Sequence, residues 1–158
     1  HAGFDAAWSH DGGSLAFLSN KPGWRHLFIA SPDTTQVRQV TRGEFEVCWC
    51  GWSPDDSQLA YVCNQADLQT RSLWLVDAEG KETRALVQGG LVTGGWFLRQ
   101  ANLEWSPDGG MSAFVHSGSR HMPELCLVDV HAPHRVQTLH TSLPQGAGGG
   151  SRVAWARA

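Results

Sequence analysis

The chain has 158 residues, of which 41% are hydrophobic and 17% are charged. This balance is typical of a globular protein and excludes a largely disordered one. The formal net charge is −3, and the scattered lysines and arginines give no basic surface for nucleic acid or for an anionic membrane. No apolar run reaches the roughly 18 residues of a membrane-spanning helix. We therefore expect a globular chain without nucleic-acid or membrane partners.

One motif occurs three times and begins each time with tryptophan. Trp8, Trp52 and Trp105 lie 44 and 53 residues apart, and each is followed by a turn of the Ser-Pro-Asp-Gly type and a short apolar run. These residue types suit the positions of a type I turn that ends in a left-handed residue. His10 replaces the proline in the first copy, and Asp56 replaces the glycine in the second.

Each copy of the motif belongs to a longer repeated unit. Two further apolar runs follow the turn, first at residues 27–29, 73–76 and 125–128, and then ending at Val40, Leu86 and Leu139. Together with the runs on either side of the turn, each unit holds four short strand candidates. Antiparallel four-stranded units at this spacing are typical of propeller blades. We predict an all-β fold, a β-propeller fragment of three four-stranded antiparallel blades.

The predicted blades divide the chain into four parts. Blade 1 comprises residues 1–43, blade 2 with a trailing loop at 88–100 comprises 44–100, blade 3 comprises 101–143, and 144–158 form a linker and the start of a further strand. The repeated tryptophans are predicted to pack between blades, as are Phe17, Tyr61 and Phe114. Three blades do not close a ring. Because the chain also lacks an initial methionine, we expect a piece of a longer protein or a ring completed by oligomerisation.

Several side chains could carry chemistry, and the aspartates and cysteines favour structural roles. Asp11, Asp55 and Asp108 recur inside the same turn, which favours turn formation over metal binding. The cysteines lack the compact spacing of a zinc site, so free buried thiols are favoured; they are Cys48, Cys50, Cys63 and Cys126. Cys48 and Cys50 are expected on one strand face because they lie two residues apart.

The carboxylates, histidines and serines give no complete catalytic site either. Glu44 and Glu46 are expected to share an exposed strand face, with acid–base chemistry or ammonium binding as the alternative. The histidines expected in solvated loops are His116, His121, His131 and His134. The serines preceded by a glycine at two positions are Ser14, Ser53, Ser112 and Ser151, and none has the second glycine of a Gly-x-Ser-x-Gly elbow. Residues 146–151 lack the lysine of a P-loop. We therefore predict no catalytic residue, cofactor site or metal ligand in this chain.

The repeats and their flanking segments resemble the propeller domain of the prolyl oligopeptidase and dipeptidyl peptidase IV-like serine peptidases. The flanking segments that carry the resemblance are residues 23–28, 40–47, 72–76 and 141–144. The resemblance implies that the propeller caps an α/β-hydrolase domain, which would follow residue 158 and would carry the catalytic triad. The glutamate pair that holds the substrate's amino terminus in dipeptidyl peptidases lies upstream of the matching region, so that role is not assigned to Glu44 and Glu46.

The resemblance implies a non-catalytic segment that gates the access of peptide substrates, with the hydrolase domain and the remaining blades as partners. One alternative is a TolB-like propeller that binds proteins without enzymatic activity, because TolB shares the Trp-Ser-Pro-Asp-Gly repeat. Another is a half-propeller that assembles with itself. The compartment is not determined by the sequence; the cytoplasm is favoured, with the periplasm as the alternative.

Overall fold

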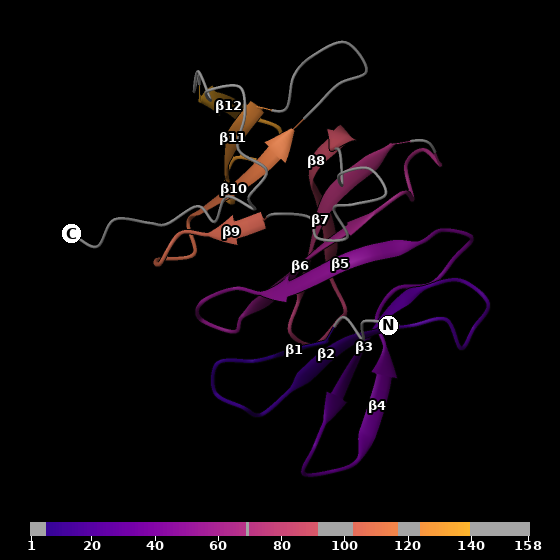
Figure 1. Ribbon diagram of the computed structural model, residues 1–158. Coiled ribbons are helices and arrows are strands. Elements are labelled where there is room, and N and C mark those ends of the chain that lie inside the picture. The colour runs from indigo at the N-terminus through magenta and orange to yellow at the C-terminus, as the bar shows by residue number, and fades with distance from the viewer. Residues whose placement is uncertain (1–5, 69, 92–102, 117–123, 140–158) are drawn as a thin grey trace, which may run out of the picture.

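The computed structural model describes residues 6–68, 70–91, 103–116 and 124–139. These residues form twelve strands in three four-stranded antiparallel sheets, and the strands of each sheet are neighbours in chain order (Figure 1). The predicted all-β fold of three blades is therefore confirmed. The described part of the chain contains no helix long and apolar enough to cross a membrane.

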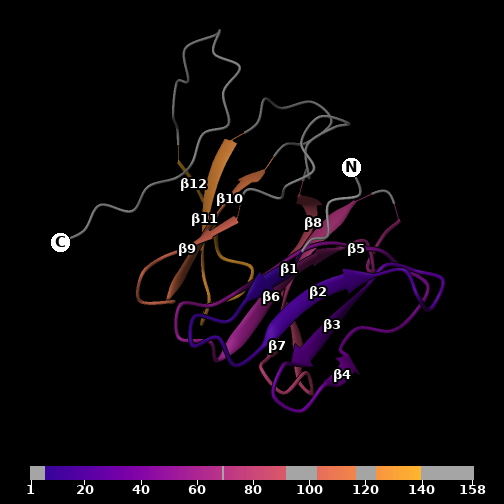
Figure 2. The same ribbon diagram turned by 60° about the horizontal axis from the view of Figure 1, so that its bottom comes forward.

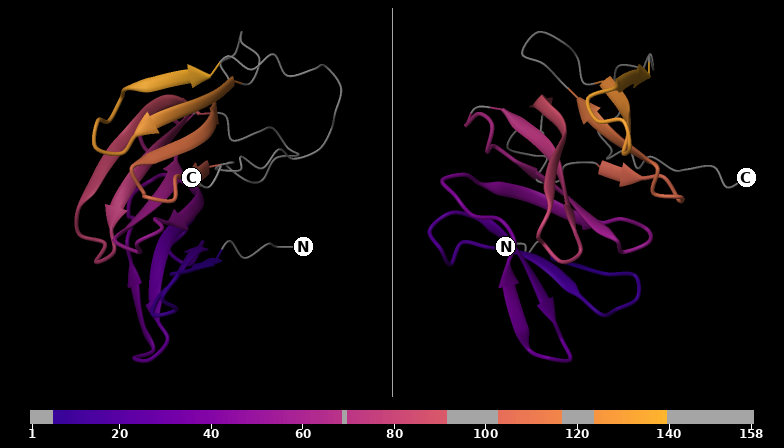
Figure 3. Two further views of the ribbon diagram at one scale, coloured as in Figure 1. Left: turned by 90° about the vertical axis from the view of Figure 1, so that its left-hand side faces the viewer. Right: turned by 180° about the vertical axis from the view of Figure 1, so that it is seen from behind.

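Each sheet is one blade. Blade 1 comprises β1 (Ala6–Trp8), β2 (Leu15–Ser19), β3 (His26–Ser31) and β4 (Gln36–Gln39). Blade 2 comprises β5 (Val47–Trp52), β6 (Gln58–Cys63), β7 (Arg71–Asp77) and β8 (Thr83–Leu91). Blade 3 comprises β9 (Leu103–Trp105), β10 (Met111–His116), β11 (Glu124–Asp129) and β12 (Val136–Leu139). Figure 2 shows the strands of blade 1 lying in order from β1 to β4, and Figure 3 shows blade 2 between the other two blades.

The turn after each repeated tryptophan is held by the same hydrogen bonds. In blade 1 the Ser9 hydroxyl donates to the Asp11 carboxylate at 2.6 Å and accepts the Ser14 N–H at 2.9 Å. Gly12 occupies the left-handed position of this turn, with φ of 75°. The equivalent bonds form within residues 53–58 and 106–111. The predicted turn geometry and the structural role of its aspartate are thus confirmed in all three blades.

Two hydrophobic cores fill the spaces between the blades. The core between blades 1 and 2 includes Ala16, Leu18, Leu27, Ile29, Cys50, Trp52, Leu59, Tyr61 and Val76. The core between blades 2 and 3 includes Ala60, Val62, Leu73, Leu75, Leu86, Leu103, Phe114, Cys126 and Val128. Because the side chains of a strand alternate between the two faces of its sheet, β6 contributes Leu59 to one core and Ala60 to the other. The middle blade is therefore covered on both faces.

The three repeated tryptophans differ in burial although their motifs are alike. Trp52 is 6% exposed, Trp105 is half-buried against the second core, and Trp8 is 56% exposed. Each of these tryptophans lies on the face that meets the preceding blade, and within the described residues no sheet precedes blade 1. Packing between blades is confirmed for Trp52 and Trp105, whereas for Trp8 it stays a prediction, because the described residues include no blade on that side of blade 1. The same contrast separates the buried Tyr61 and Phe114 from Phe17, which is only half-buried and stacks on Phe28 within blade 1.

A bulge in β5 changes the orientation of the neighbouring cysteines. The register of β5 against β6 shifts between Val47 and Trp49, which interrupts the alternation of side chains. As a result Cys48 packs against the second core, whereas Cys50 is part of the first core. The prediction that these two thiols share one strand face is therefore wrong. All four cysteines are free thiols, and all except the half-buried Cys48 are buried, as expected.

The end of blade 2 also differs from the prediction. β8 continues through Gly89 and Gly90 to Leu91, although the sequence suggested that a loop begins at Gln88. The register of β7 against β8 shifts twice near Leu73, and such irregularities allow a strand to accommodate extra residues. Residues 92–100 of the predicted loop and the predicted linker at 144–158 lie outside the described residues.

Candidate functional site

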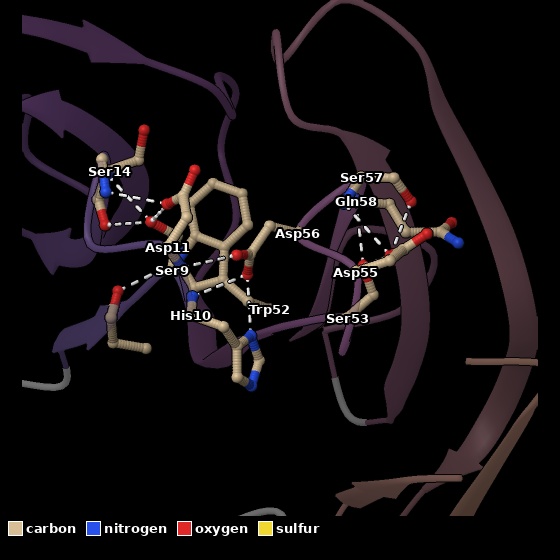
Figure 4. Close-up of polar contacts among 12 residues, drawn as sticks. Ser9, His10, Asp11, Ser14, Trp52, Ser53, Asp55, Asp56, Ser57 and Gln58 are labelled. Atoms are coloured by element: carbon tan, nitrogen blue, oxygen red, sulfur yellow. Dashed lines mark hydrogen bonds and ion pairs between the residues drawn. The ribbon is translucent and has the colours of Figure 1, made fainter. Parts of the chain in front are cut away.

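Polar side chains connect blade 1 to blade 2 at the repeated turns. Asp56, at the left-handed position of the turn in blade 2, reaches the turn of blade 1 (Figure 4). Its carboxylate accepts the backbone N–H of His10 at 2.8 Å and that of Asp11 at 2.9 Å, and it lies 2.7 Å from His10 Nδ1. Partial burial opposes the charged form of Asp56, but these hydrogen bonds together outweigh it and lower the pKa of the carboxyl group.

Two arginines form equivalent hydrogen bonds on the outermost strands. Arg38 Nη2 of blade 1 donates to the carbonyl oxygen of Ala78 in blade 2 at 2.9 Å, and Arg84 Nη1 of blade 2 donates to Val130 of blade 3 at 2.7 Å. The two arginines hold the same register position, opposite Ile29 and Leu75. The sequence analysis did not single them out, although their recurrence in the fourth strand of successive units was available as a signal.

A buried histidine links two of the segments on which the family resemblance rests. His26 is 2% exposed, and its Nδ1 and Nε2 lie 3.1 Å from Thr41 Oγ1 and from the Gly43 carbonyl oxygen. Because a carbonyl oxygen only accepts, Nε2 carries the proton in the contact with Gly43. Thr41 Oγ1 in turn accepts the Leu27 N–H at 2.9 Å, and the Phe45 ring packs edge-on against His26. The arrangement satisfies the histidine internally and gives it a structural role.

Glu44 and Glu46 do not lie on a strand, although the sequence analysis predicted that they share one strand face. Glu44 and Glu46 precede β5, because the chain turns at Gly43, whose φ is 134°, and Phe45 packs into the first core. Glu44 is exposed, whereas Glu46 is half-buried and its carboxylate accepts the backbone N–H of Arg25 at 3.2 Å. The prediction of a shared strand face is therefore wrong, and Glu46 contacts blade 1 instead of forming a site with Glu44.

The serines and histidines considered for catalysis lie apart. The Ser53 hydroxyl donates to Asp55 at 2.7 Å within its turn, and the backbone N–H of Ser14 donates to the Ser9 hydroxyl in the equivalent turn. Ser112 is buried on β10, where its hydroxyl has no hydrogen-bond partner among the described residues. His131 and His134 are exposed in the turn between β11 and β12, as expected. His116 is the half-buried last residue of β10, whereas His121 and Ser151 lie outside the described residues.

Hydrogen bonds within each turn favour the charged form of its aspartate. Hydrogen bonds from the neighbouring serine lower the pKa of Asp11, Asp55 and Asp108. Each carboxylate is occupied by donors of its own turn, and within the residues that the structure describes no group of three potential ligands could hold a metal ion. These aspartates therefore stabilise the turns.

Two open hollows lie at equivalent places on blades 2 and 3. One, of about 310 Å³, is lined by Leu75, Asp77 and neighbouring residues, and the other, of about 480 Å³, is lined by Leu127, Asp129 and their neighbours. Leu75 and Leu127 occupy the same position in the third strands of their blades, opposite Arg84 and Gln137. The hollows are thus a repeated feature of the outer hairpins and give no distinct ligand site.

Comparison with known families places more than half of the chain in one of them. Residues 4–93 match the model of the family described as the dipeptidyl peptidase IV N-terminal region. The matched segment includes blades 1 and 2 as the structure defines them, together with the His26–Thr41–Gly43 contact.

Several solved structures have the same fold. A protein described as a TolB from Agrobacterium tumefaciens aligns over 87% of this chain with a TM-score of 0.65 and 18% identity. Dipeptidyl peptidase 4 from Porphyromonas gingivalis aligns over 86% with a TM-score of 0.66 and 16% identity, and a puromycin-hydrolyzing peptidase from Mycobacterium tuberculosis over 88% with 0.66 and 18%. The chain spans only 50%, 18% and 22% of these three proteins, respectively.

Proposed function

Because this chain belongs to the family of the dipeptidyl peptidase IV N-terminal region, we propose that it is a non-catalytic propeller segment of a prolyl oligopeptidase-family serine peptidase. In this proposal an α/β-hydrolase domain elsewhere in the longer protein hydrolyses short peptides through an acyl-enzyme. The propeller segment gates the access of those peptides. The family match over residues 4–93 is the observation that carries the proposal.

The way the chain uses its polar groups supports a non-catalytic role. Glu46, Asp56 and Arg84 accept from or donate to backbone groups of an adjacent blade. Within the described residues, the carboxylates, serines and histidines considered for catalysis do not converge on one point. The segment is thus suited to positioning blades, and the reacting groups of a peptidase would come from another domain.

The free face of blade 1 supports the presence of further blades as partners. One row of side chains crosses all four strands in register and comprises Trp8, Leu15, Ala30 and Val37. Trp8 and Val37 at the ends of this row are 56% and 59% exposed. In blade 2 the equivalent residues include Trp52, Leu59 and Val76, which are buried between blades 1 and 2. An apolar row of this kind favours burial against another blade.

A second candidate function is that of a TolB-like propeller that binds proteins without catalysis. The similarity to the Agrobacterium protein favours it, because its TM-score of 0.65 over 87% of the chain is close to the values for the two peptidases. In this alternative the longer protein consists of additional blades or binding domains without a hydrolase domain.

A fluorophosphonate probe distinguishes the two candidates, because it reacts covalently with the activated serine of serine peptidases. The natural protein that contains this segment would be labelled, digested and mapped by mass spectrometry. We expect one modified serine outside residues 1–158, together with hydrolysis of short peptides but not of folded proteins. No labelling of the folded protein would favour the TolB-like alternative. Labelling of a serine within residues 1–158 would contradict both.

A further inference from the structure

We call the contact between blades 1 and 2 the first joint and the contact between blades 2 and 3 the second joint. At both joints the same two turn positions face each other, but they hold different residues. At the first joint, the left-handed residue of the blade 2 turn, Asp56, meets the second turn residue of blade 1, His10. At the second joint the equivalent residues are Gly109 and Pro54. A Cβ atom added to Gly109 would lie 3.7 Å from Pro54 Cδ, so these two positions also face each other. One joint therefore pairs aspartate with histidine, and the other pairs glycine with proline.

At this pair of positions, only the first joint has the groups for a polar contact. Proline lacks a backbone N–H and glycine lacks a side chain, so Pro54 and Gly109 can form neither half of it. His10 supplies both a backbone N–H and a ring nitrogen to Asp56, whereas a proline at position 10 would supply neither. The two departures from the repeated motif are therefore complementary to each other.

Asp56 forms its contact with His10 although its backbone adopts a conformation that is unfavourable for a residue with a side chain. Its φ is 57°, in the left-handed region that glycine occupies without steric penalty. The His10 side chain is 60% exposed, whereas that of Asp56 is 16% exposed, so the carboxylate is shielded where it receives its donors. Charge-assisted hydrogen bonds of this kind are among the stronger ones in proteins.

We propose that His10 and Asp56 form a joint-specific clamp that holds blade 1 on blade 2 and selects blade 1 as the neighbour of the blade 2 turn. A turn with proline at the second position offers the Asp56 carboxylate one donor fewer and no imidazole. A turn with glycine at the left-handed position offers His10 no acceptor. The pair therefore distinguishes one neighbour from another within a set of similar blades, much as complementary polar residues distinguish partners at other interfaces.

A double-mutant cycle on the full 158-residue chain tests the coupling. The variants are His10→Pro, Asp56→Gly and the combination, which recreates the Pro54–Gly109 pair at the first joint. We expect His10→Pro alone to lower Tm by about 2–6 °C, because the Asp56 carboxylate loses two of its three contacts. In the double variant this loss should be largely recovered. If the Tm changes of the two single variants simply add in the double variant, the proposed coupling is wrong.

Amide hydrogen exchange followed by NMR reports the clamp without relying on Tm. In the wild-type chain the N–H groups of His10 and Asp11 both donate to Asp56. Asp56→Gly should accelerate exchange at these two amides by about ten-fold or more, while the Gly12 N–H, which donates to the Ser9 carbonyl oxygen, keeps its protection. Asp56→Asn, which tolerates the left-handed conformation and keeps one acceptor oxygen, should retain part of the protection. Unchanged exchange at His10 and Asp11 in Asp56→Gly would overturn the proposal.

The reciprocal exchange tests whether the two positions are sufficient. Pro54→His combined with Gly109→Asp should install a clamp at the second joint, with new protection of the residue 54 and Asp55 amides. Gly109→Asp alone serves as the matched control, because it introduces the carboxylate and its backbone strain without the added donors. Because residue 54 is still proline in the control, the comparison is made at the Asp55 amide. If this amide gains no more protection in the double variant than in the control, the pair does not determine the joint.

Discussion

The indole N–H of Trp52 in blade 2 donates to the backbone carbonyl oxygen of Ala7 in blade 1 at 3.0 Å. Ala7 belongs to β1, and Trp52 is the last residue of β5, so this bond joins the first strands of two successive blades. The indole ring lies in the core between the blades and its polar edge is satisfied, as is usual for a buried tryptophan. Trp52 thus fixes blade 2 on blade 1 through both apolar packing and a hydrogen bond.

This arrangement predicts a large effect on stability for one substitution of the repeated tryptophan and a small effect for another. Trp52→Ala removes a buried side chain and should lower the free energy of unfolding by about 3–5 kcal/mol. Trp8→Ala removes a side chain that is 56% exposed and should change it by less than about 1 kcal/mol. Urea denaturation followed by far-ultraviolet circular dichroism measures both. Equal effects of the two substitutions would contradict the packing described here.

Substitution of an arginine on an outermost strand should change the free energy of unfolding by less than substitution of Trp52, and only where the side chain contacts the next blade. Arg38→Gln removes the donor to the Ala78 carbonyl oxygen and should cost about 0.5–1.5 kcal/mol in the free energy of unfolding. Glutamine is the residue that blade 3 has at this register position, Gln137. Gln137→Ala is therefore the matched control and should change the stability by less than about 0.5 kcal/mol. A control effect as large as that of Arg38→Gln would show that the arginine does not act through the joint.

The turn carboxylates predict a loss of stability in acid. Hydrogen bonds lower the pKa of Asp55 and Asp108 below the usual value of 3.8, and Asp56 follows the same direction. A carboxyl group with a lowered folded-state pKa stabilises the fold above its unfolded pKa, and this contribution disappears as the pH falls through the folded pKa. The free energy of unfolding should therefore decline between about pH 4 and pH 2. Denaturation curves measured across this interval test it, and a constant value down to pH 2 would refute the role of the charged turns.

The buried thiols predict a loss of stability in alkali. Burial raises the pKa of Cys63 from 9.0 to about 11, and burial raises the pKa of Tyr61 as well. Between these two cysteine values the unfolded chain releases a proton that the folded chain retains, so the free energy of unfolding should fall as the pH rises from 9 to 11. Cys63→Ala should reduce the slope of this decline, measured under reducing conditions. An unchanged slope in the variant would mean that Cys63 does not contribute.

The blades could be predicted from the sequence because their signals are local and repeated. Ser53, Asp55 and the residues after them satisfy each other within one turn, so the residue types alone indicate its geometry. The prediction for Cys48 and Cys50 failed because strict alternation ignores a bulge, and no residue type in β5 marks where the register shifts. That for Glu44 and Glu46 failed because the chain turns at Gly43 before the strand begins.

The contacts between blades could not be predicted from local patterns. Asp56 meets His10 across 46 residues of sequence, and Arg38 meets Ala78 across 40. Such contacts depend on how one blade is rotated and shifted against the next, which the periodicity of a single blade does not determine. The unusual residues at positions 10 and 56 were visible in the sequence as separate departures from the motif, and only the structure shows that they are partners.

The blades stack so that the middle blade is covered on both faces. Hydrogen–deuterium exchange of the 158-residue chain, followed by mass spectrometry of its peptides, tests this most directly. We expect the slowest exchange in the peptides that contain β6 and β7, and faster exchange in those of β1 and β4, since no described sheet covers one face of blade 1. Uniform exchange across the three sheets, or the slowest exchange in blade 1, would contradict it.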